Sequence, residues 1–322
     1  VEFLPVLYAS EAAFTLLRND GLYPSRFRLD HCVSADLSDG YKVALLSKAK
    51  EIIDIENPDA IICSLSGNGV GIDEAMIEES NVPTFMLQDY WGDANTGLGS
   101  VADIFFVLDQ FSADLTLRRW GRPSVIFGSP KHLGYKNIDV LKLREVFRSS
   151  IGVSPLDSVI ACFLQSSSII GHDNVFLSLA SSLAGSDFSG VVLVRGHPKY
   201  PADALNIVEG FHNRGIRVRD VSSIGTSEEV LAACDLLTSA FSTSGLDHAY
   251  LSCFSSEPIG TVLYLMFDVN LCAEFTKVSG FSDMVCAMPH LAHSVFDVGQ
   301  LEDRIKVGLS DSYRQEYFHN SK

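Results

Sequence analysis

Short apolar runs alternate with amphipathic segments along the whole chain. The runs are rich in Val, Ile, Leu and Phe, which is typical of strands buried on both faces of a parallel sheet. We predict strands at residues 3–8, 26–33, 60–65, 83–87, 104–108, 124–127, 159–164, 191–194, 216–221, 236–239 and 260–267. We predict helices between them at residues 10–18, 41–53, 73–79, 112–120, 139–149, 172–183, 202–214, 227–233, 242–252 and 300–309. The segment after residue 267 is expected to be mostly helical.

This alternation predicts an α/β fold. Strands that alternate with helices build parallel sheets, because each helix returns the chain to the edge where the next strand begins. The pattern restarts near residue 155, after a turn at residues 152–155. We therefore predict two Rossmann-like, doubly wound parallel-sheet lobes that face a cleft, at residues 1–152 and 153–322, with the option that the last helix packs back on the first lobe.

Three polar loops follow predicted strands of the second lobe, at residues 165–168, 195–199 and 239–245. Parallel strands end at the same edge of their sheet, so these loops are expected to meet where open α/β sheets bind ligands. The loop at 239–245 also opens a helix, and the amides and positive dipole end of a helix start suit a phosphate. The candidate phosphate or nucleotide ligands in these loops are Ser167, Arg195, His197, Pro198, Lys199, Ser242, Thr243, Ser244 and Gly245.

Each of these loops also has an ordinary interpretation. Ser and Thr are common helix N-caps, and a His can simply end a core strand. His197 is followed by Pro198, which restricts the backbone at that point. The phosphate-site interpretation depends on three such loops sharing one edge.

A glycine-rich turn at residues 67–71 follows a buried strand of the first lobe. Its pattern is G-x-G-x-G, so it does not match the G-x-G-x-x-G of dinucleotide-binding proteins, and no Gly-Lys-Ser/Thr of a P-loop is present. The glycines let the backbone turn closely at the expected cleft and expose Asp73 or Glu74. The alternative is that both carboxylates only complement the dipole of the helix they open.

Composition narrows the choice of partner. The 322 residues are 47% hydrophobic and carry a net charge of −16, which indicates a globular chain with a large core. The one basic cluster is Arg118, Arg119 and Arg122. A chain with so little positive charge is not expected to bind duplex nucleic acid, and binding to an anionic membrane surface is disfavoured for the same reason. No apolar run reaches the length of a membrane span. The seven cysteines include no C-x-x-C pair, which favours reduced thiols over a disulfide framework or a zinc site.

The lobe pattern and two motifs resemble metal-independent glycosyltransferases of the GT-B fold. The strand that ends in His197-Pro198 is similar to the His-Pro motif of bacterial sialyltransferases, polysialyltransferases and related capsule enzymes. The Ser-Thr-Ser-Gly turn at residues 242–245 resembles the phosphate-binding loop of those enzymes, of wall teichoic acid glycerophosphotransferases and of UDP-N-acetylglucosamine 2-epimerases. The resemblance implies that His197 contacts the donor phosphate or nucleotide, that the turn cradles the phosphate, and that Asp247 reaches a ribose hydroxyl.

The same resemblance makes the first lobe the acceptor side. It implies that Asp73 or Glu74 is the base that deprotonates the acceptor hydroxyl in an inverting transfer. Asp89 and Trp91 resemble an Asp-x-Trp motif of GT-B-like capsule proteins, in which the Trp would offer a platform for a sugar ring. A Trp packed against the neighbouring loop is the alternative. Gly69, in the glycine-rich turn, is a further acceptor-side candidate.

The resemblance implies a cytoplasmic enzyme, peripheral at the inner membrane, that needs no metal and no cofactor. It would transfer a sugar from a nucleotide- or phosphate-activated donor to a glycan acceptor in bacterial capsule or O-antigen synthesis, alongside other polysaccharide-synthesis enzymes. Two alternatives stay open: an isomerase of the nucleotide-sugar 2-epimerase type, and a non-catalytic sugar-phosphate-binding protein. The donor is open among CMP-, UDP-, GDP- and CDP-linked sugars and phosphoribosyl donors.

Overall fold

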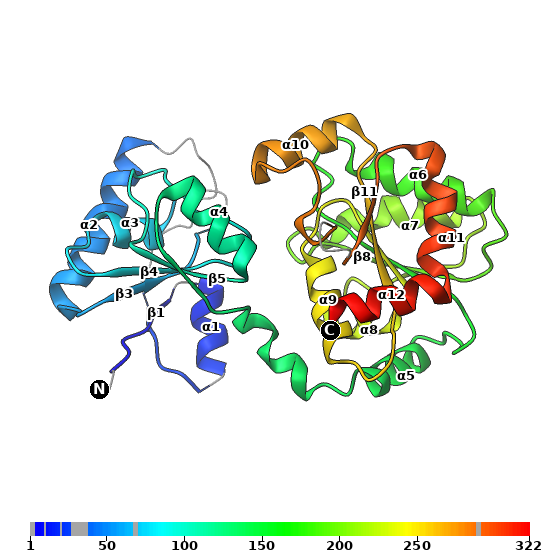
Figure 1. Ribbon diagram of the computed structural model, residues 1–322, viewed down its shortest axis with the longest axis horizontal. Coiled ribbons are helices and arrows are strands. Elements are labelled where there is room, and N and C mark those ends of the chain that lie inside the picture. The colour runs from blue at the N-terminus through cyan, green and yellow to red at the C-terminus, as the bar shows by residue number, and fades with distance from the viewer. Residues whose placement is uncertain (1–3, 10, 20, 27–37, 67–69, 288–290) are drawn as a thin grey trace. The chain divides into compact units, whose positions relative to one another are not determined.

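The chain forms two compact units, Val1–Pro130 and Lys131–Lys322, each with its own parallel sheet (Figure 1). The structure is a computed structural model that describes residues 4–9, 11–19, 21–26, 38–66, 70–287 and 291–322. The predicted fold class of two Rossmann-like α/β lobes is confirmed. Within the described ranges, no helix is long and apolar enough to cross a membrane.

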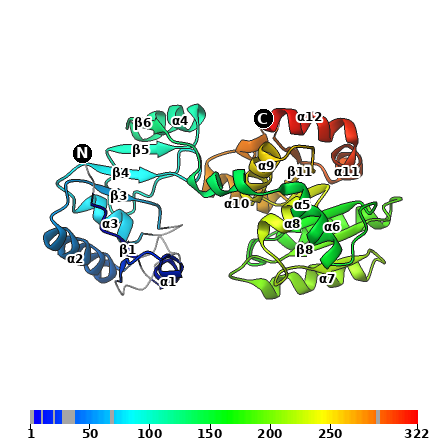
Figure 2. The same ribbon diagram turned by 90° about the horizontal axis from the view of Figure 1, so that it is seen from below.

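The first unit is built on four parallel strands in the order β3-β4-β5-β6, and β1 and β2 form a separate parallel pair (Figure 2). The strands are β1 (Tyr8–Ala9), β2 (Ser25–Arg26), β3 (Ile61–Cys63), β4 (Thr84–Leu87), β5 (Ile104–Val107) and β6 (Ser124–Ile126). The helices are α1 (Glu11–Asn19), α2 (Asp39–Glu56), α3 (Ile72–Glu78) and α4 (Gln110–Trp120). Apolar side chains of the sheet and of α3 form its core, among them Ile61, Cys63, Ile77, Met86 and Phe105.

Local signals explain where the longest helix of this unit begins and ends. The Ser38 side chain accepts a hydrogen bond from the Tyr41 amide at the start of α2. At the other end Asn57 adopts a left-handed backbone (φ 43°), and Pro58 follows, which cannot continue a helix. Helix α2 is therefore longer than the predicted 41–53. Most of the strand predicted at 26–33 lies outside the described residues.

The second unit has a six-stranded parallel sheet in the order β12-β11-β10-β7-β8-β9. Its strands are β7 (Val159–Phe163), β8 (Val191–Arg195), β9 (Val218–Asp220), β10 (Leu236–Ser239), β11 (Thr261–Leu265) and β12 (His293–Val295). In chain order this is the doubly wound Rossmann arrangement, in which the direction of winding reverses between β7 and β10. The central strands are buried on both faces, which is why their sequences are continuous apolar runs.

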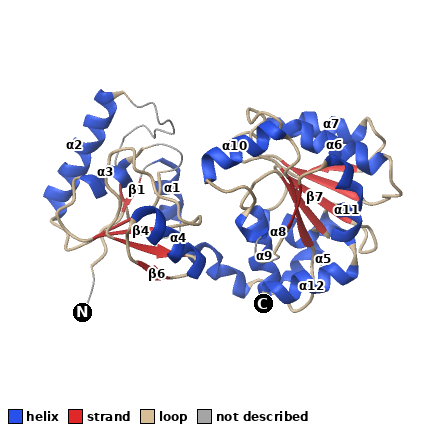
Figure 3. Cartoon of the chain, turned by 45° about the horizontal axis from the view of Figure 1, so that its top comes forward, coloured by secondary structure: helices blue, strands red, loops and turns tan. Residues whose placement is uncertain are grey.

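Helices cover both faces of this sheet (Figure 3). One layer holds α6 (His172–Ala184), α7 (Ala204–His212) and α11 (Leu301–Leu309), and the other holds α5 (Val140–Ser150), α8 (Ser227–Ala233), α9 (Ser244–Phe254) and α12 (Asp311–Ser321). The remaining elements are α10 (Val269–Ser279) and the 3₁₀ segments η1 (Pro130–Asn137), η2 (Pro201–Asp203), η3 (Val285–Ala287) and η4 (Val298–Gln300).

The division between the units lies before helix α5, whereas the sequence analysis places the boundary at 152/153. Helix α5 packs on α8, and its Arg144 and Arg148 donate to the buried carboxylate of Asp235. Arg148 also donates to the Ala233 carbonyl at 2.8 Å. These long-range contacts make α5 part of the second unit, although a turn separates it from the next strand in sequence.

The C-terminal region contains one strand that was not predicted, and its last helix packs within the second unit. His293–Val295 is a strand, β12, because it pairs with β11 at the sheet edge; three residues are too few to give a clear strand pattern. The last helix, α12, lies beside α9 in the second unit (Figure 1). There the buried His248 Nδ1 and Tyr317 hydroxyl are 2.8 Å apart.

Candidate functional site

The three polar loops of the second unit follow three neighbouring strands, β8, β7 and β10. Phe163 pairs with both Arg195 and Ser239, so these strands end level with one another. The Ser239 hydroxyl donates to the Phe163 carbonyl at 2.9 Å, and the Phe241 amide donates to Gln165 Oε1 at 3.1 Å. The structure therefore brings the loops together at the switch point of the sheet, where doubly wound folds bind ligands.

His197 sits in a tight turn directly after β8. The Tyr200 amide donates to the His197 carbonyl at 2.8 Å, and Pro198 occupies the second position of this turn, where its fixed φ is favourable. The Lys199 amide donates to His197 Nδ1 at 3.2 Å, which leaves Nε2 as the protonated nitrogen of the neutral ring. Burial, together with the charge of Lys199, lowers the pKa of His197. The ring is thus a neutral N–H donor at pH 7.

The two basic residues predicted beside His197 have different surroundings. The Arg195 guanidinium donates to the carbonyls of Val221 at 3.0 Å and Gly225 at 3.3 Å. Arg195 therefore braces the loop after β9, a role that the sequence pattern does not reveal. Lys199 is exposed, and its side chain makes no hydrogen bond or ion pair with the residues that the structure describes.

Helix α9 begins inside the predicted Ser-Thr-Ser-Gly turn. Thr243 is its N-cap but gives no side-chain hydrogen bond to the helix amides of the described chain. The Ser244 amide donates to the Ser242 hydroxyl at 3.2 Å. Ser244 is only 5% exposed, and among the described residues its hydroxyl is one of the buried polar groups with no hydrogen-bond partner. A buried hydroxyl that lacks a partner, at a helix start whose N-cap side chain makes no bond, is suited to an anion.

Gly245 is explained by packing. A Cβ at this position would lie 2.0 Å from the hydroxyl oxygen of Tyr264. That hydroxyl donates to the Ser242 carbonyl at 3.2 Å. The absence of a side chain at Gly245 therefore lets the fully buried Tyr264 pack against the turn and hydrogen-bond to it.

The loop after β7 is held by its own amides. The Gln165 amide donates to His172 Nε2 at 3.0 Å, and the Ser167 amide donates to Asp203 Oδ2 at 2.8 Å. His172 is fully buried, and burial lowers its pKa although Asp173 lies 2.9 Å from Nδ1. Because the Ser167 amide is already bonded, its exposed hydroxyl is the group that could contact a ligand. The sequence analysis missed His172, whose role depends on a loop that folds back onto it.

Asp247 contacts two side chains of η1, at the start of the second unit. Its Oδ1 lies 2.7 Å from both Lys131 Nζ and His132 Nε2. Burial alone would raise the pKa of Asp247, but the bonds from His132 and Lys131 outweigh it and hold the pKa below its ordinary value. This cluster could not be predicted from the sequence, because Lys131 and His132 are each more than a hundred residues away from Asp247 in the chain.

The two carboxylates at the start of α3 are not equivalent. Glu74 is buried, and its carboxylate accepts the amides of Ser66 at 3.1 Å and Gly71 at 2.8 Å. Asp73 accepts the Ser64 amide at 3.0 Å and the Ser66 hydroxyl at 3.1 Å. Burial raises the pKa of Asp73. Glu74 therefore closes the turn, and Asp73 is the carboxyl whose proton affinity suits a base. Gly69 lies outside the described residues.

Asp73 also lines a cavity of about 470 Å³ in the first unit. Apolar side chains of residues 6–9, α2, β3 and α3 line it together with polar ones, among them Tyr8, Glu56 and Ser66. A carboxyl in a cavity of this size, lined by both polar and apolar groups, can meet a substrate hydroxyl.

Trp91 belongs to the interior of the first unit. It is 6% exposed, and its indole Nε1 donates to Asp109 Oδ2 at 2.8 Å. Its burial favours the packing alternative over a sugar platform. Asp89, two residues earlier, is exposed. Across the residues that the structure describes, no group of three or more His, Cys, Asp or Glu side chains could hold a metal ion.

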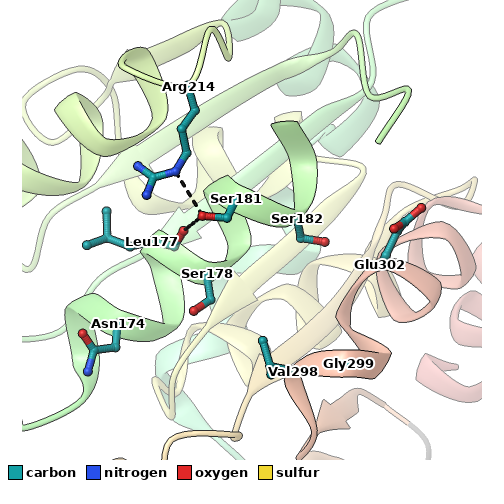
Figure 4. Close-up of a pocket in the computed structure, with 9 residues that line it drawn as sticks. All are labelled: Asn174, Leu177, Ser178, Ser181, Ser182, Arg214, Val298, Gly299 and Glu302. Carbon is teal, nitrogen blue, oxygen red and sulfur yellow. Dashed lines mark hydrogen bonds between the residues drawn. The ribbon is translucent and has the colours of Figure 1, made fainter. Parts of the chain in front are cut away.

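A second groove, of about 560 Å³, lies away from the three loops, between α6 and the η4–α11 segment (Figure 4). Ser178, Ser181 and Ser182 form one wall, and Arg214 donates to the Ser181 hydroxyl at 3.0 Å. None of the residues predicted from the sequence lines this groove.

The fold is shared with solved enzymes that act on sugars, at very low sequence identity. No protein-family model matches the chain, and no curated protein matches it by sequence. The UDP-GlcNAc 2-epimerase of Neisseria meningitidis bound to UDP-GlcNAc is 11% identical, with a TM-score of 0.62 over 95% of this chain and 82% of its own. A glycosyltransferase from Rickettsia africae is 11% identical, with a TM-score of 0.60 over 98% of this chain and 85% of its own. MurG from Acinetobacter baumannii is 10% identical, with a TM-score of 0.56 over the same shares. These similarities establish the two-lobed Rossmann-like fold.

Proposed function

We propose that this chain is a metal-independent glycosyltransferase that binds an activated sugar donor at the carboxyl edge of the second unit's sheet. One observation carries the proposal. The turn before α9, in which Thr243 gives no side-chain cap bond and the buried Ser244 hydroxyl has no partner among the described residues, lies on the same edge as the neutral N–H donor of His197. Similar folds in a glycosyltransferase and in a UDP-GlcNAc-bound epimerase support a nucleotide sugar as the ligand.

The donor phosphate would accept hydrogen bonds from the Gly245 amide, from the Ser244 hydroxyl and from His197 Nε2. Negative charge builds on the leaving phosphate oxygen as the bond to the sugar breaks. Fixed N–H and O–H donors and a helix dipole stabilise that charge without reorganising. Ser242, Thr243 and Lys199 are the other donor-side candidates, and Asp247 as a ribose contact stays a prediction.

Asp73 is the proposed base. It would take the proton of the acceptor hydroxyl as that oxygen attacks the anomeric carbon, which inverts the configuration. A raised pKa brings a carboxylate closer to the range in which a base works at neutral pH. The neighbouring cavity would hold part of the acceptor. Bacterial surface-glycan synthesis, at the cytoplasmic side of the membrane, is the proposed setting.

The direct test is a thermal-shift panel of CMP-, UDP-, GDP- and CDP-linked sugars and phosphoribosyl pyrophosphate, followed by transfer assays with the best ligand. Binding to the folded state raises the unfolding temperature by mass action. We expect one nucleotide class to stabilise the protein and its sugar to be transferred. A protein that no member of the panel stabilises would contradict the proposal.

A 2-epimerase activity is the second candidate, because the epimerase structures share the fold equally well. It predicts turnover of the nucleotide sugar with no acceptor present, detected by a change at the sugar's C2. Tight donor binding with neither reaction would indicate a non-catalytic binding protein.

A further inference from the structure

Lys131 places a positive charge beside the first turn of helix α9. Its Nζ lies 2.7 Å from Asp247 Oδ1, and the Asp247 amide donates to the Thr243 carbonyl at 3.2 Å. The ammonium is therefore held next to the turn that carries Ser244. Lys131 comes from η1, a segment that the sequence motifs do not include.

His132 and Lys131 share the same carboxylate oxygen but differ in mobility. The His132 side chain is 3% exposed, and its ring stacks on Tyr250 with centroids 4.0 Å apart. The Lys131 side chain is 60% exposed. His132 therefore anchors η1 to α9, and an ion pair with so exposed a partner adds little to folding. The Lys131 ammonium can move toward a ligand without loosening that anchor.

The charges at this helix start would favour a further anion. A cation near the positive end of a helix dipole is unfavourable unless negative charge offsets it. Asp247 supplies one such charge, and its oxygen already serves His132. The Ser244 hydroxyl, 5% exposed, is an independent sign of a missing acceptor, because it is buried without a partner in the described structure.

We propose that Lys131 binds the phosphate of the donor, with Asp247 and His132 positioning the lysine beside the α9 turn. The inference rests on the proposed function and adds a residue from η1, at the start of the second unit, to the donor site. The phosphate would lie between the Ser244 turn and the lysine ammonium, which gives a charge-assisted contact where the turn alone offers neutral donors.

The test measures the dissociation constant by calorimetry for the nucleotide of the donor panel that binds the wild type most tightly. We expect Lys131→Gln to raise this dissociation constant about tenfold or more, the usual effect of losing a charge-assisted hydrogen bond. Lys131→Arg should stay within about threefold, because it keeps the charge and the donors. Lys136→Gln, an exposed lysine of the same 3₁₀ segment, is the matched control and should leave the constant unchanged.

Salt dependence and thermal unfolding complete the test. Binding to Lys131→Gln should weaken less with added salt than binding to the wild type, since one charge pair is gone. All three variants should unfold at the wild-type temperature, which separates loss of the contact from loss of the fold. Equal affinities for Lys131→Gln and the wild type would overturn the role of Lys131 alone. A wild type that binds no nucleotide of the panel would overturn the proposed function itself.

Discussion

Replacing Gly245 by Ala should disrupt the turn before α9 through a buried collision. The new methyl carbon would lie 2.0 Å from the Tyr264 hydroxyl oxygen, 2.8 Å from its Cζ and 3.0 Å from Val262 Cγ1. Tyr264 is completely buried, so the ring cannot swing into solvent. Either the ring or the turn must move, and the hydrogen bond from the Tyr264 hydroxyl to the Ser242 carbonyl is lost.

The size of the effect follows from two parts. Overpacking a tight core costs about 1–3 kcal/mol, and the lost hydrogen bond about 0.5–1.5 kcal/mol. We therefore expect Gly245→Ala to lower the free energy of unfolding by about 2–4 kcal/mol. Tyr264→Phe removes the colliding oxygen. The double variant should consequently be more stable than the sum of the two single changes predicts, by about 1 kcal/mol or more.

Urea unfolding followed by circular dichroism measures all three free energies. Gly185→Ala is a matched control in the same unit, because its methyl would meet no atom closer than 3.6 Å. That control should change the stability by less than about 1 kcal/mol. Strictly additive effects of Gly245→Ala and Tyr264→Phe would refute the packing explanation. They would instead favour a glycine required only for backbone access to the phosphate.

Three further predictions concern single side chains. Asp235→Asn removes the buried carboxylate that pairs with Arg144 and Arg148 and should cost about 3–5 kcal/mol in urea unfolding; a loss below about 1 kcal/mol would contradict it. Asp73→Asn should slow transfer about 100-fold or more at unchanged donor affinity. The base must be ionised to accept a proton, and the pKa of Asp73 is raised in the folded protein. The wild-type transfer rate should therefore rise with pH over a pH range above the usual pKa of an Asp. The same pH profile in Asp73→Asn would show that Asp73 is not the base. His197→Gln should retain more donor affinity than His197→Ala in calorimetry, since an amide can replace the Nε2 donor; equal losses would contradict that contact. The lowered pKa keeps His197 neutral, so wild-type binding should not change above about pH 7.

The strands of the second unit could be predicted closely because burial on both faces makes them continuous apolar runs. The strand predicted at 191–194, for example, is β8, which extends one residue further to Arg195. β12 was not predicted, because its three residues form a strand only through pairing with β11. The unit boundary was also misplaced: α5 reads like any amphipathic helix, and the contacts of Arg148 with Ala233 and Asp235 decide where it packs.

The candidate site shows the same division. Polar loops after apolar strands were visible in the sequence, and the parallel sheet makes them neighbours. The sequence did not reveal which of the candidate side chains already make hydrogen bonds within the protein. Glu74 closes its own turn, Arg195 braces a loop, and Trp91 donates to Asp109, although all three belong to residue types that commonly bind ligands.

The sequence by itself determined the α/β class, the two lobes and the location of polar loops at strand ends, because these depend on the order and periodicity of residues close together in the chain. The tertiary structure alone decided which groups keep an unsatisfied hydrogen bond or charge. Lys131 and His132 meet Asp247 across 116 and 115 residues, and no local pattern records such a meeting. Hydrogen bonds and ion pairs act over a few ångströms of space, and only the packed fold specifies those distances.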